Sequence, residues 1–229
     1  MDIASNIFTV TAALLLPVGI GVWLSLKKKG YLKPLLLGVL TFVVFQVVTR
    51  IPLIQVVLPR MPWYTVMTMG YPLLSALFLG GTAALFEEGG RYLVMSLFLK
   101  DRQRVSDGIA FGIGHGGVEA VLLAGTNALI VLLAGVGTDA GLMFAGGVER
   151  LFAMTLHVAW SVMVLKSVRE RKIGYLILAL VLHTVIDMAA VMAQYYGMSI
   201  LEIEAIIGVS ALVMLGYTIY EYKSKKEMS

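Results

Sequence analysis

Cysteine is absent from the 229 residues, which excludes disulfide bonds, thiolate metal ligands, iron–sulfur clusters and cysteine nucleophiles. Charge is scarce as well, because 14% of the residues are charged and 59% are hydrophobic. With a mean hydropathy of +0.89, the chain lies outside the balance of ordinary soluble domains. These shortages exclude a water-soluble globule and leave oxygen and imidazole groups to carry any chemistry. The net charge of +4 does not indicate a nucleic-acid partner, because in a membrane protein the position of the basic residues matters more than their sum.

What the chain does have is long apolar runs with little between them. A helix that crosses the roughly 30 Å hydrocarbon layer needs about 20 mostly apolar residues. The sequence therefore predicts an all-α, polytopic integral membrane bundle whose main contact is membrane lipid. An eight-segment count is the alternative, if Gly125, Thr126 and Asn127 break the fourth span. The seven expected spans are at about 5–26, 34–58, 71–99, 107–134, 142–165, 173–195 and 200–221.

Most basic residues fall in alternate gaps between these spans. Such an alternation sets the orientation, because cytoplasmic loops carry the excess of Lys and Arg. We therefore expect an N-terminus outside and a C-terminus in the cytoplasm, in a multi-pass protein of the plasma membrane. The residues concerned are Lys27, Lys28, Lys29 and Lys33; Lys100, Arg102 and Arg104; Lys166, Arg169, Arg171 and Lys172; and Lys223, Lys225 and Lys226.

No linker or soluble domain is visible, so we expect residues 1–229 to form a single transmembrane domain. All six prolines fall at or before Pro72, where they would kink the first two spans. We expect residues 5–70 to be scaffold, 71–195 to hold the catalytic core, and 200–229 to form the last helix with a basic cytoplasmic tail.

Spans three to six carry ionisable residues that are costly in lipid, at about 2.5–3.5 kcal/mol each near the bilayer centre. Within each helix they lie three, four or seven residues apart, so each helix has one polar face. At 1.5 Å per residue, the four helices bring them to similar depths. The set is Glu87, Glu88 and Arg91; His115 and Glu119; Glu149, Arg150 and His157; and His183 and Asp187.

A single pair such as Glu88 with Arg91 is more often a structural ion pair than a catalytic one. The whole set favours function, because its carboxylates outnumber its two arginines, which suits general acid–base chemistry. Gly-Gly pairs at 80–81, 89–90, 116–117 and 146–147 accompany the charges. Close helix packing explains such pairs, and room for substrate or water is the functional alternative.

Peptide hydrolysis needs an activated water, a proton donor for the leaving amine and a stabiliser of the oxyanion. Glu87 or Glu88 can deprotonate water, and Arg91 can fix this carboxylate pair. His115 can orient the water or shuttle a proton. His183 and Asp187 can polarise the carbonyl group. The additional candidates, selected by their depth and by the helix face they share, are Glu119, Glu149, Arg150 and His157. The H-E-x-x-H, G-x-S-x-G and G-x-G-D motifs of other intramembrane proteases are absent from the sequence.

Three ordered motifs carry a family resemblance: Glu87-Glu88-Gly-Gly-Arg91-Tyr92, Phe111-Gly-Ile-Gly-His115-Gly-Gly-Val-Glu119 and His183-Thr-Val-Ile-Asp187. They resemble those of the CAAX-protease and bacteriocin-processing superfamily of glutamic-type intramembrane proteases. The YhfC-like branch is the most similar, and PrsW is more distant.

This resemblance implies a water activated by Glu87 or Glu88, assistance by His115, and an oxyanion side lined by His183 and Asp187. The substrate would be a membrane-bound or hydrophobic peptide. Two residues separate Glu88 from Arg91 where the prenyl-protease pattern has three, and Asp187 stands where Asn is common. A prenylated substrate is therefore not expected.

Two alternatives remain open on the sequence. His115, His157 and His183 could offer three nitrogens to Zn²⁺, which would leave a water site for Glu87 or Glu88 to activate. Alternatively, the buried Glu, His and Asp residues could form the relay of a proton- or ion-coupled transporter. Beyond zinc, the pattern predicts no cofactor.

Overall fold

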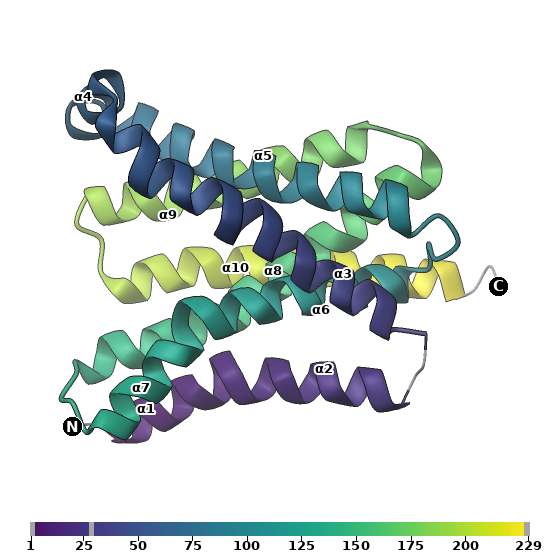
Figure 1. Ribbon diagram of the computed structural model, residues 1–229, viewed down its shortest axis with the longest axis horizontal. Helices are drawn as coiled ribbons and strands as arrows, with labels where there is room; N and C mark the ends of the chain where they lie inside the picture. Colours follow the sequence, from purple (N-terminus) through teal and green to yellow (C-terminus); the bar gives the residue numbers. More distant parts are fainter. Residues whose placement is uncertain (1–2, 28–29, 227–229) are drawn as a thin grey trace. The chain divides into compact units, whose positions relative to one another are not determined.

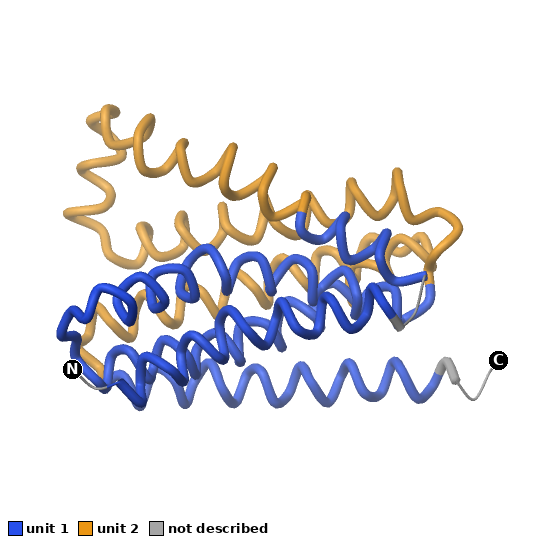
Figure 2. Tube along the Cα trace, turned by 60° about the horizontal axis from the view of Figure 1, so that its bottom comes forward, with its two compact units in different colours: residues 1–39, 104–162, 200–229 blue, residues 40–103, 163–199 orange. Residues whose placement is uncertain are grey.

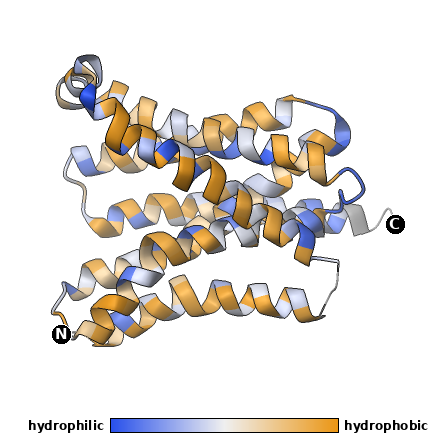
Figure 3. Cartoon of the chain, in the orientation of Figure 1, coloured by the Kyte–Doolittle hydropathy of each residue, from blue (hydrophilic) through white to orange (hydrophobic). Residues whose placement is uncertain are grey.

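The computed structural model describes residues 3–27 and 30–226, which form helices joined by short connections with no strand among them (Figure 1). Within these ranges, six helices are long and apolar enough to cross a membrane. The count is seven if α4 (Pro62–Gly70) and α5 (Pro72–Phe98), which meet at a bend of 116°, form one broken span. Figure 3 shows apolar residues along every long helix. The predicted all-α polytopic membrane fold is confirmed.

The observed helices follow the predicted spans to within several residues. Between Val105 and Ala134 the chain is continuously helical, so the expected fourth span is unbroken at Gly125. Lys28 and Lys29, which contribute to the predicted orientation, lie outside the described residues. The remaining elements are α1 (Ile3–Val10), η1 (Thr11–Leu15), α2 (Leu16–Lys27), α3 (Leu32–Phe42), η2 (Val43–Arg50), η3 (Leu53–Val57), η4 (Leu58–Arg60), α6 (Val105–Ala120), η5 (Val121–Gly125), α7 (Thr126–Ala134), α8 (Ala140–Glu170), α9 (Gly174–Tyr195) and α10 (Ile200–Lys226).

The prolines disturb the first two spans as expected. The wide helical turns of η1 end just before Pro17, and Pro52 separates η2 from η3. Proline has no N–H to give to the preceding turn, so the ladder of helical hydrogen bonds adjusts around it.

The chain divides into two compact units, shown in different colours in Figure 2. Unit 1 comprises residues 1–39, 104–162 and 200–229, and unit 2 comprises 40–103 and 163–199. Helices α3 and α8 pass from one unit to the other after Val39 and Val162. The assignment of 5–70 to scaffold and 71–195 to a catalytic core stays a prediction.

Small residues set the close helix contacts of unit 1. A Cβ added to Gly125 would lie 2.8 Å from the carbonyl oxygen of Ala13, and one added to Gly114 would lie 2.1 Å from that of Leu35. Such contacts require a residue without a side chain, as in many membrane helix interfaces. They hold η5 against η1, and α6 against α3.

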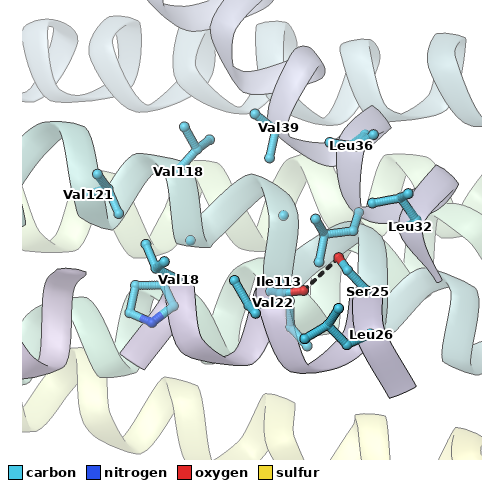
Figure 4. A pocket seen from close by; sticks show the side chains of 15 residues that line it. Val18, Val22, Ser25, Leu26, Leu32, Leu36, Val39, Ile113, Val118 and Val121 are labelled. Atoms are coloured by element: carbon cyan, nitrogen blue, oxygen red, sulfur yellow. Dashed lines mark hydrogen bonds between the residues drawn. The ribbon is translucent and has the colours of Figure 1, made fainter. Parts of the chain in front are cut away.

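Helices α2, α3 and α6 also border an apolar groove of unit 1 with a volume of about 560 Å³ (Figure 4). Its lining includes Val18, Val22 and Leu36, and nearly all its wall atoms are apolar. The hydroxyl of Ser25 donates a hydrogen bond to the Gly21 carbonyl of its own helix at 2.8 Å. This groove therefore offers a surface for hydrocarbon and none of the predicted site residues.

In unit 2, α5 and α9 lie side by side along their length (Figure 1). A Cβ on Gly80 would meet the Thr184 carbonyl at 3.0 Å and Asp187 at 3.1 Å, while Glu88 lies opposite His183. The residue numbers run in opposite directions along this contact, so the two helices are antiparallel. Close packing therefore explains Gly80, as the sequence suggested.

Candidate functional site

The predicted site residues form two clusters, one in each unit, in which some side chains are buried and others are partly exposed. We call the set in unit 2 the Glu88 cluster; it is held by α5 and α9 and comprises Glu87, Glu88, Arg91, His183 and Asp187. We call the set in unit 1 the Glu119 cluster; it is held by α6 and α8 and comprises His115, Glu119, Glu149, Arg150 and His157.

Arg91 is the cation of the Glu88 cluster. Its guanidinium donates to Oε1 of Glu88 and, at 3.2 Å, to Oε2 of Glu87. The three side chains share one face of α5 because they are three and four residues apart. Arg91 and Glu88 have no exposed side-chain surface, and Glu87 is almost as deeply buried. A buried charge of this kind is tolerated only when it is paired.

His183 links Glu88 to α9. Its Nδ1 lies 2.8 Å from Glu88 Oε1, and its Nε2 lies 3.5 Å from Asp187 Oδ2. Asp187 is one turn along from His183 on the same helix face, as the H-x-x-x-D spacing predicts. An imidazole placed between two carboxylates can pass a proton from one side to the other.

Gln46 and Arg50 of η2 extend the hydrogen bonds of the Glu88 cluster, although neither is among the predicted site residues. The Gln46 amide donates to Glu87 Oε1 at 2.8 Å, and Arg50 donates to Gln46 Oε1 at 3.3 Å. Arg50 also donates to the Leu79 carbonyl at 2.7 Å. A signal was present, since an arginine inside an apolar span, four residues after a glutamine, marks a polar helix face.

In unit 1, two glycines of α6 let α8 approach closely. A Cβ on Gly112 would lie 2.5 Å from the Val158 Cα, and one on Gly116 would lie 3.0 Å from the His157 Cβ. The backbone of α6 thus packs directly on the turn of α8 that carries His157. The rings of His115 and His157 lie with their centroids 5.2 Å apart.

Glu119 is the hub of its cluster. Its Oε2 lies 2.6 Å from His157 Nε2, and its Oε1 accepts a hydrogen bond from Arg150 at 3.0 Å. Arg150 also donates to the neighbouring carboxylate of Glu149. One carboxylate therefore binds both an arginine and a histidine, which fixes the orientation of all three side chains.

Each pair of helices brings its own predicted residues together. The contacts of the Glu88 cluster are those that the spacing predicted. Arg91 lies against Glu87 and Glu88, and His183 lies near Asp187. Glu119 and His157, which were selected by depth and facing, are in direct contact. The convergence of all four helices on one pocket stays a prediction.

Comparison with known proteins agrees with this arrangement of motifs. The sequence model of the YhfC intramembrane metalloprotease family matches residues 12–143 and 137–209, which together hold every predicted site residue. The chain belongs to the YhfC intramembrane metalloprotease family. This membership confirms the resemblance to YhfC proteins that the three motifs indicated.

A relative supports the same family. The chain is 28% identical over 236 aligned residues to the "Uncharacterized membrane protein YhfC" of Bacillus subtilis (strain 168). The alignment covers 91% of this chain and 90% of that protein. No solved structure matches the chain. Membership of the YhfC family and the apolar helices identify a multi-pass integral membrane protein.

The family name implies a metal ion, and the donor atoms of the Glu119 cluster fit one. His115, Glu119 and His157 each present a potential ligand atom, and these atoms lie within 4.8 Å of one another. Two imidazoles and one carboxylate form a ligand set that catalytic zinc uses, with a further position left for water. All three residues are buried or nearly so, and Arg150 already orients Glu119.

The Glu88 cluster fits a cation less well. Glu87, Glu88 and His183 also bring potential ligand atoms within 4.8 Å of one another. Here, however, the Arg91 guanidinium already bonds to both carboxylates and would repel a second cation. The zinc set of His115, His157 and His183 stays a prediction, while the contacts within unit 1 favour Glu119 as the third ligand.

Proposed function

We propose that this YhfC-family protein is an intramembrane endopeptidase that hydrolyses a hydrophobic or membrane-anchored peptide. The observation that carries the proposal is the carboxylate of Glu88, fully buried between a guanidinium and an imidazole. In this view the protein lies in the plasma membrane with its N-terminus outside and its C-terminus in the cytoplasm. Lipid surrounds it, and the substrate reaches it from the lipid phase.

The hydrogen bonds distinguish the roles of the two glutamates. Both oxygens of Glu87 accept hydrogen bonds, from Gln46 and from Arg91. In Glu88, Oε1 accepts from Arg91, whereas the buried Oε2 has no hydrogen-bond partner among the described residues. A buried acceptor of this kind calls for a water or a ligand. Glu88 is therefore the general base, and Glu87 holds Arg91 in place.

The reaction follows from these roles. Glu88 Oε2 takes a proton from water while the water oxygen attacks the carbonyl carbon of the peptide bond. His183, backed by Asp187, polarises the carbonyl oxygen as negative charge develops on it. The C–N bond then breaks, and the proton held by Glu88 passes to the leaving amine. The assistance by His115 that the family resemblance implies stays a prediction.

The Glu119 cluster supports the same chemistry. A zinc ion held by His115, Glu119 and His157 would polarise a carbonyl oxygen or lower the pKa of a water molecule. Arg150 orients the Glu119 carboxylate through the 3.0 Å hydrogen bond. The two glycines of α6 keep the ring of His157 close to that of His115.

The test uses purified protein reconstituted in liposomes with a mixture of single-span bacterial membrane proteins. Mass spectrometry of labelled amines counts the new N-termini that cleavage creates. We expect Glu88→Gln to lower their rate of appearance by roughly 10²–10⁴-fold, because the general base is lost. Glu87→Gln should reduce it less. The matched control is Glu170→Gln, at the end of α8, where the carboxylate pairs with Arg169 and Lys172 outside both clusters.

If Glu88→Gln retains the normal rate, or if the wild-type protein creates no new termini, the peptidase proposal is wrong. Ion transport, the alternative drawn from the sequence, is measured in the same liposomes with an enclosed pH-sensitive dye. A proton flux that requires Glu88, without any cleavage, would support transport instead.

A further inference from the structure

A second cavity of unit 1 lies where α7 is joined to α8. Its volume is about 450 Å³. We call it the polar vestibule, because side chains with hydrogen-bonding groups form much of its wall. The lining residues that matter here are Asn127, Thr138, Asp139, Gly146, Glu149 and Arg150. The apolar groove of the same unit has a similar volume and almost no polar wall, so the two cavities differ in the polarity of their linings.

The depth of Glu149 shows what fills the vestibule. Helix α8 begins at Ala140, so Glu149 is nine residues further on, or about 14 Å along the helix axis. This distance reaches close to the middle of a hydrocarbon layer of about 30 Å. The Glu149 side chain is nevertheless 39% exposed. A carboxylate exposed at this depth is stable when it faces water and costly when it faces lipid, so the vestibule is suited to hold water.

The glycine pair at 146–147 agrees with this assignment. A Cβ on Gly147 would lie 2.8 Å from the ring of Phe8, so this glycine serves packing. A Cβ on Gly146 would have no atom within 4 Å, and Gly146 lines the vestibule. One member of the pair thus holds α8 against α1, and the other leaves the cavity open.

Arg150 lines the vestibule, and its guanidinium also donates a hydrogen bond to Glu119, which does not line it. Arg150 bonds to Glu149 in the vestibule and to Glu119, whose other oxygen lies 2.6 Å from His157. We infer that the polar vestibule carries water from the α7–α8 side of the membrane to the Glu119–His157 pair. The inference rests on the proposed function, because hydrolysis consumes one water for each peptide bond.

The absence of cysteine makes this inference directly testable. Single-cysteine variants are placed in the vestibule at Asn127, Gly146 and Glu149, and in the α7–α8 connection at exposed Gly137. Two preparations of sealed proteoliposomes, one for each orientation of the protein, are treated separately with a charged, membrane-impermeant maleimide. A thiol reacts as the thiolate, which forms in water and not in hydrocarbon.

We expect all three vestibule variants to be labelled from the same side as Gly137→Cys. The matched control is Ile130→Cys, which is 58% exposed on α7 but does not line the vestibule. It lies closer to the connection than Asn127 and should stay unlabelled. Val22→Cys in the apolar groove, 53% exposed, should also stay unlabelled.

Two labelling results would overturn the inference. If Glu149→Cys is protected while Gly137→Cys reacts, water does not reach the depth of Glu149. If Glu149→Cys reacts from both sides, the cavity belongs to a path through the membrane, which favours the transport alternative.

A second measurement separates the route of water from the peptidase activity. Attaching a bulky maleimide to Gly146→Cys should lower the cleavage rate at least tenfold, whereas a methyl-sized thiol reagent should leave it nearly unchanged. Unchanged cleavage after the bulky modification would mean that water arrives elsewhere, although the proposed function would stand. Labelling in the expected pattern without any cleavage by the wild-type protein would contradict the proposed function and leave the aqueous cavity intact.

Discussion

The two clusters balance their charges in different ways. In the Glu88 cluster, Arg91 lies against two carboxylates and is completely buried, so the pairs are shielded from water. In the Glu119 cluster, Arg150 also binds two carboxylates, but one of them, Glu149, faces the polar vestibule. The first arrangement holds both carboxylates of Arg91 away from solvent, while the second leaves one carboxylate of Arg150 exposed at the vestibule.

The cost of breaking an ion pair inside a membrane protein therefore depends on whether its partners reach water. Where both partners are buried, removing one leaves an uncompensated charge, which costs several kcal/mol. Where one partner reaches water, the remaining charge can be hydrated.

The largest expected effect concerns metal content. We expect purified protein to hold about one zinc ion per chain, and His115→Ala or His157→Ala to remove it, because each takes away one of few ligands. His183→Ala, which removes the imidazole of the Glu88 cluster, should leave the metal bound. Elemental analysis by mass spectrometry after dialysis gives the stoichiometry. Loss of zinc in all three variants would instead support the three-histidine set.

The next effect is on stability. Replacing Arg91 with Met leaves Glu87 and Glu88 without their cation, and we expect a loss of about 3–5 kcal/mol in the free energy of unfolding. Arg150→Met should cost less, because Glu149 reaches the vestibule. Thermal unfolding in detergent micelles ranks the two variants. An Arg150→Met protein as unstable as Arg91→Met would show that both clusters are equally dry.

Helix packing gives a smaller effect. Gly116→Val places methyl groups against His157, where even a Cβ would be 3.0 Å away, so we expect a loss of about 1–3 kcal/mol. Gly146→Val, where a Cβ meets no atom within 4 Å, is the matched control and should change stability little. The same unfolding measurement applies, and equal losses would contradict the close contact at His157.

The smallest effect concerns Arg104, which precedes α6. Its side chain is 63% exposed and donates two hydrogen bonds to buried Asp107 at 3.0 Å. These hydrogen bonds and the carboxylate charge raise the pKa of Arg104 above its ordinary value. A raised pKa stabilises the fold at every pH below it, so this contribution is constant near neutrality.

Replacing this arginine with Gln should cost no more than about 1 kcal/mol, as exposed ion pairs do. Unfolding curves at mildly acidic and mildly alkaline pH should show the same small difference. A difference that grows with pH in this range would mean that Arg104 loses its proton there.

Much of this protein was predictable from its sequence. Apolar runs fixed the spans, because a helix must cover the hydrocarbon layer, and the i, i+3 and i, i+4 spacing placed Arg91 beside Glu87 and Glu88. Contacts between helices were harder. The pairing of Glu119 with His157 depends on the register of α6 against α8, which Gly112 and Gly116 set and which hydropathy does not encode.

Gln46 and Arg50 escaped prediction for a related reason. Both lie on a span whose composition reads as scaffold, and their role appears only when η2 lies against α5. Conversely, the acidic excess near Arg91 was visible in the sequence. Hydropathy and spacing could not predict which glutamate keeps an oxygen without a partner among the described residues, because that depends on the amide of Gln46.

The contact of Gly116 with His157 has one more consequence. Because backbone rather than side-chain volume sets the separation of α6 and α8 at this level, the distance between the backbones that carry the two imidazoles is close to the steric limit of the main chain. Changes in bilayer thickness or lipid composition can tilt such a helix pair as a whole without spreading its backbones. Cells that adjust their lipids to temperature would thus keep the spacing of these two backbones unaltered.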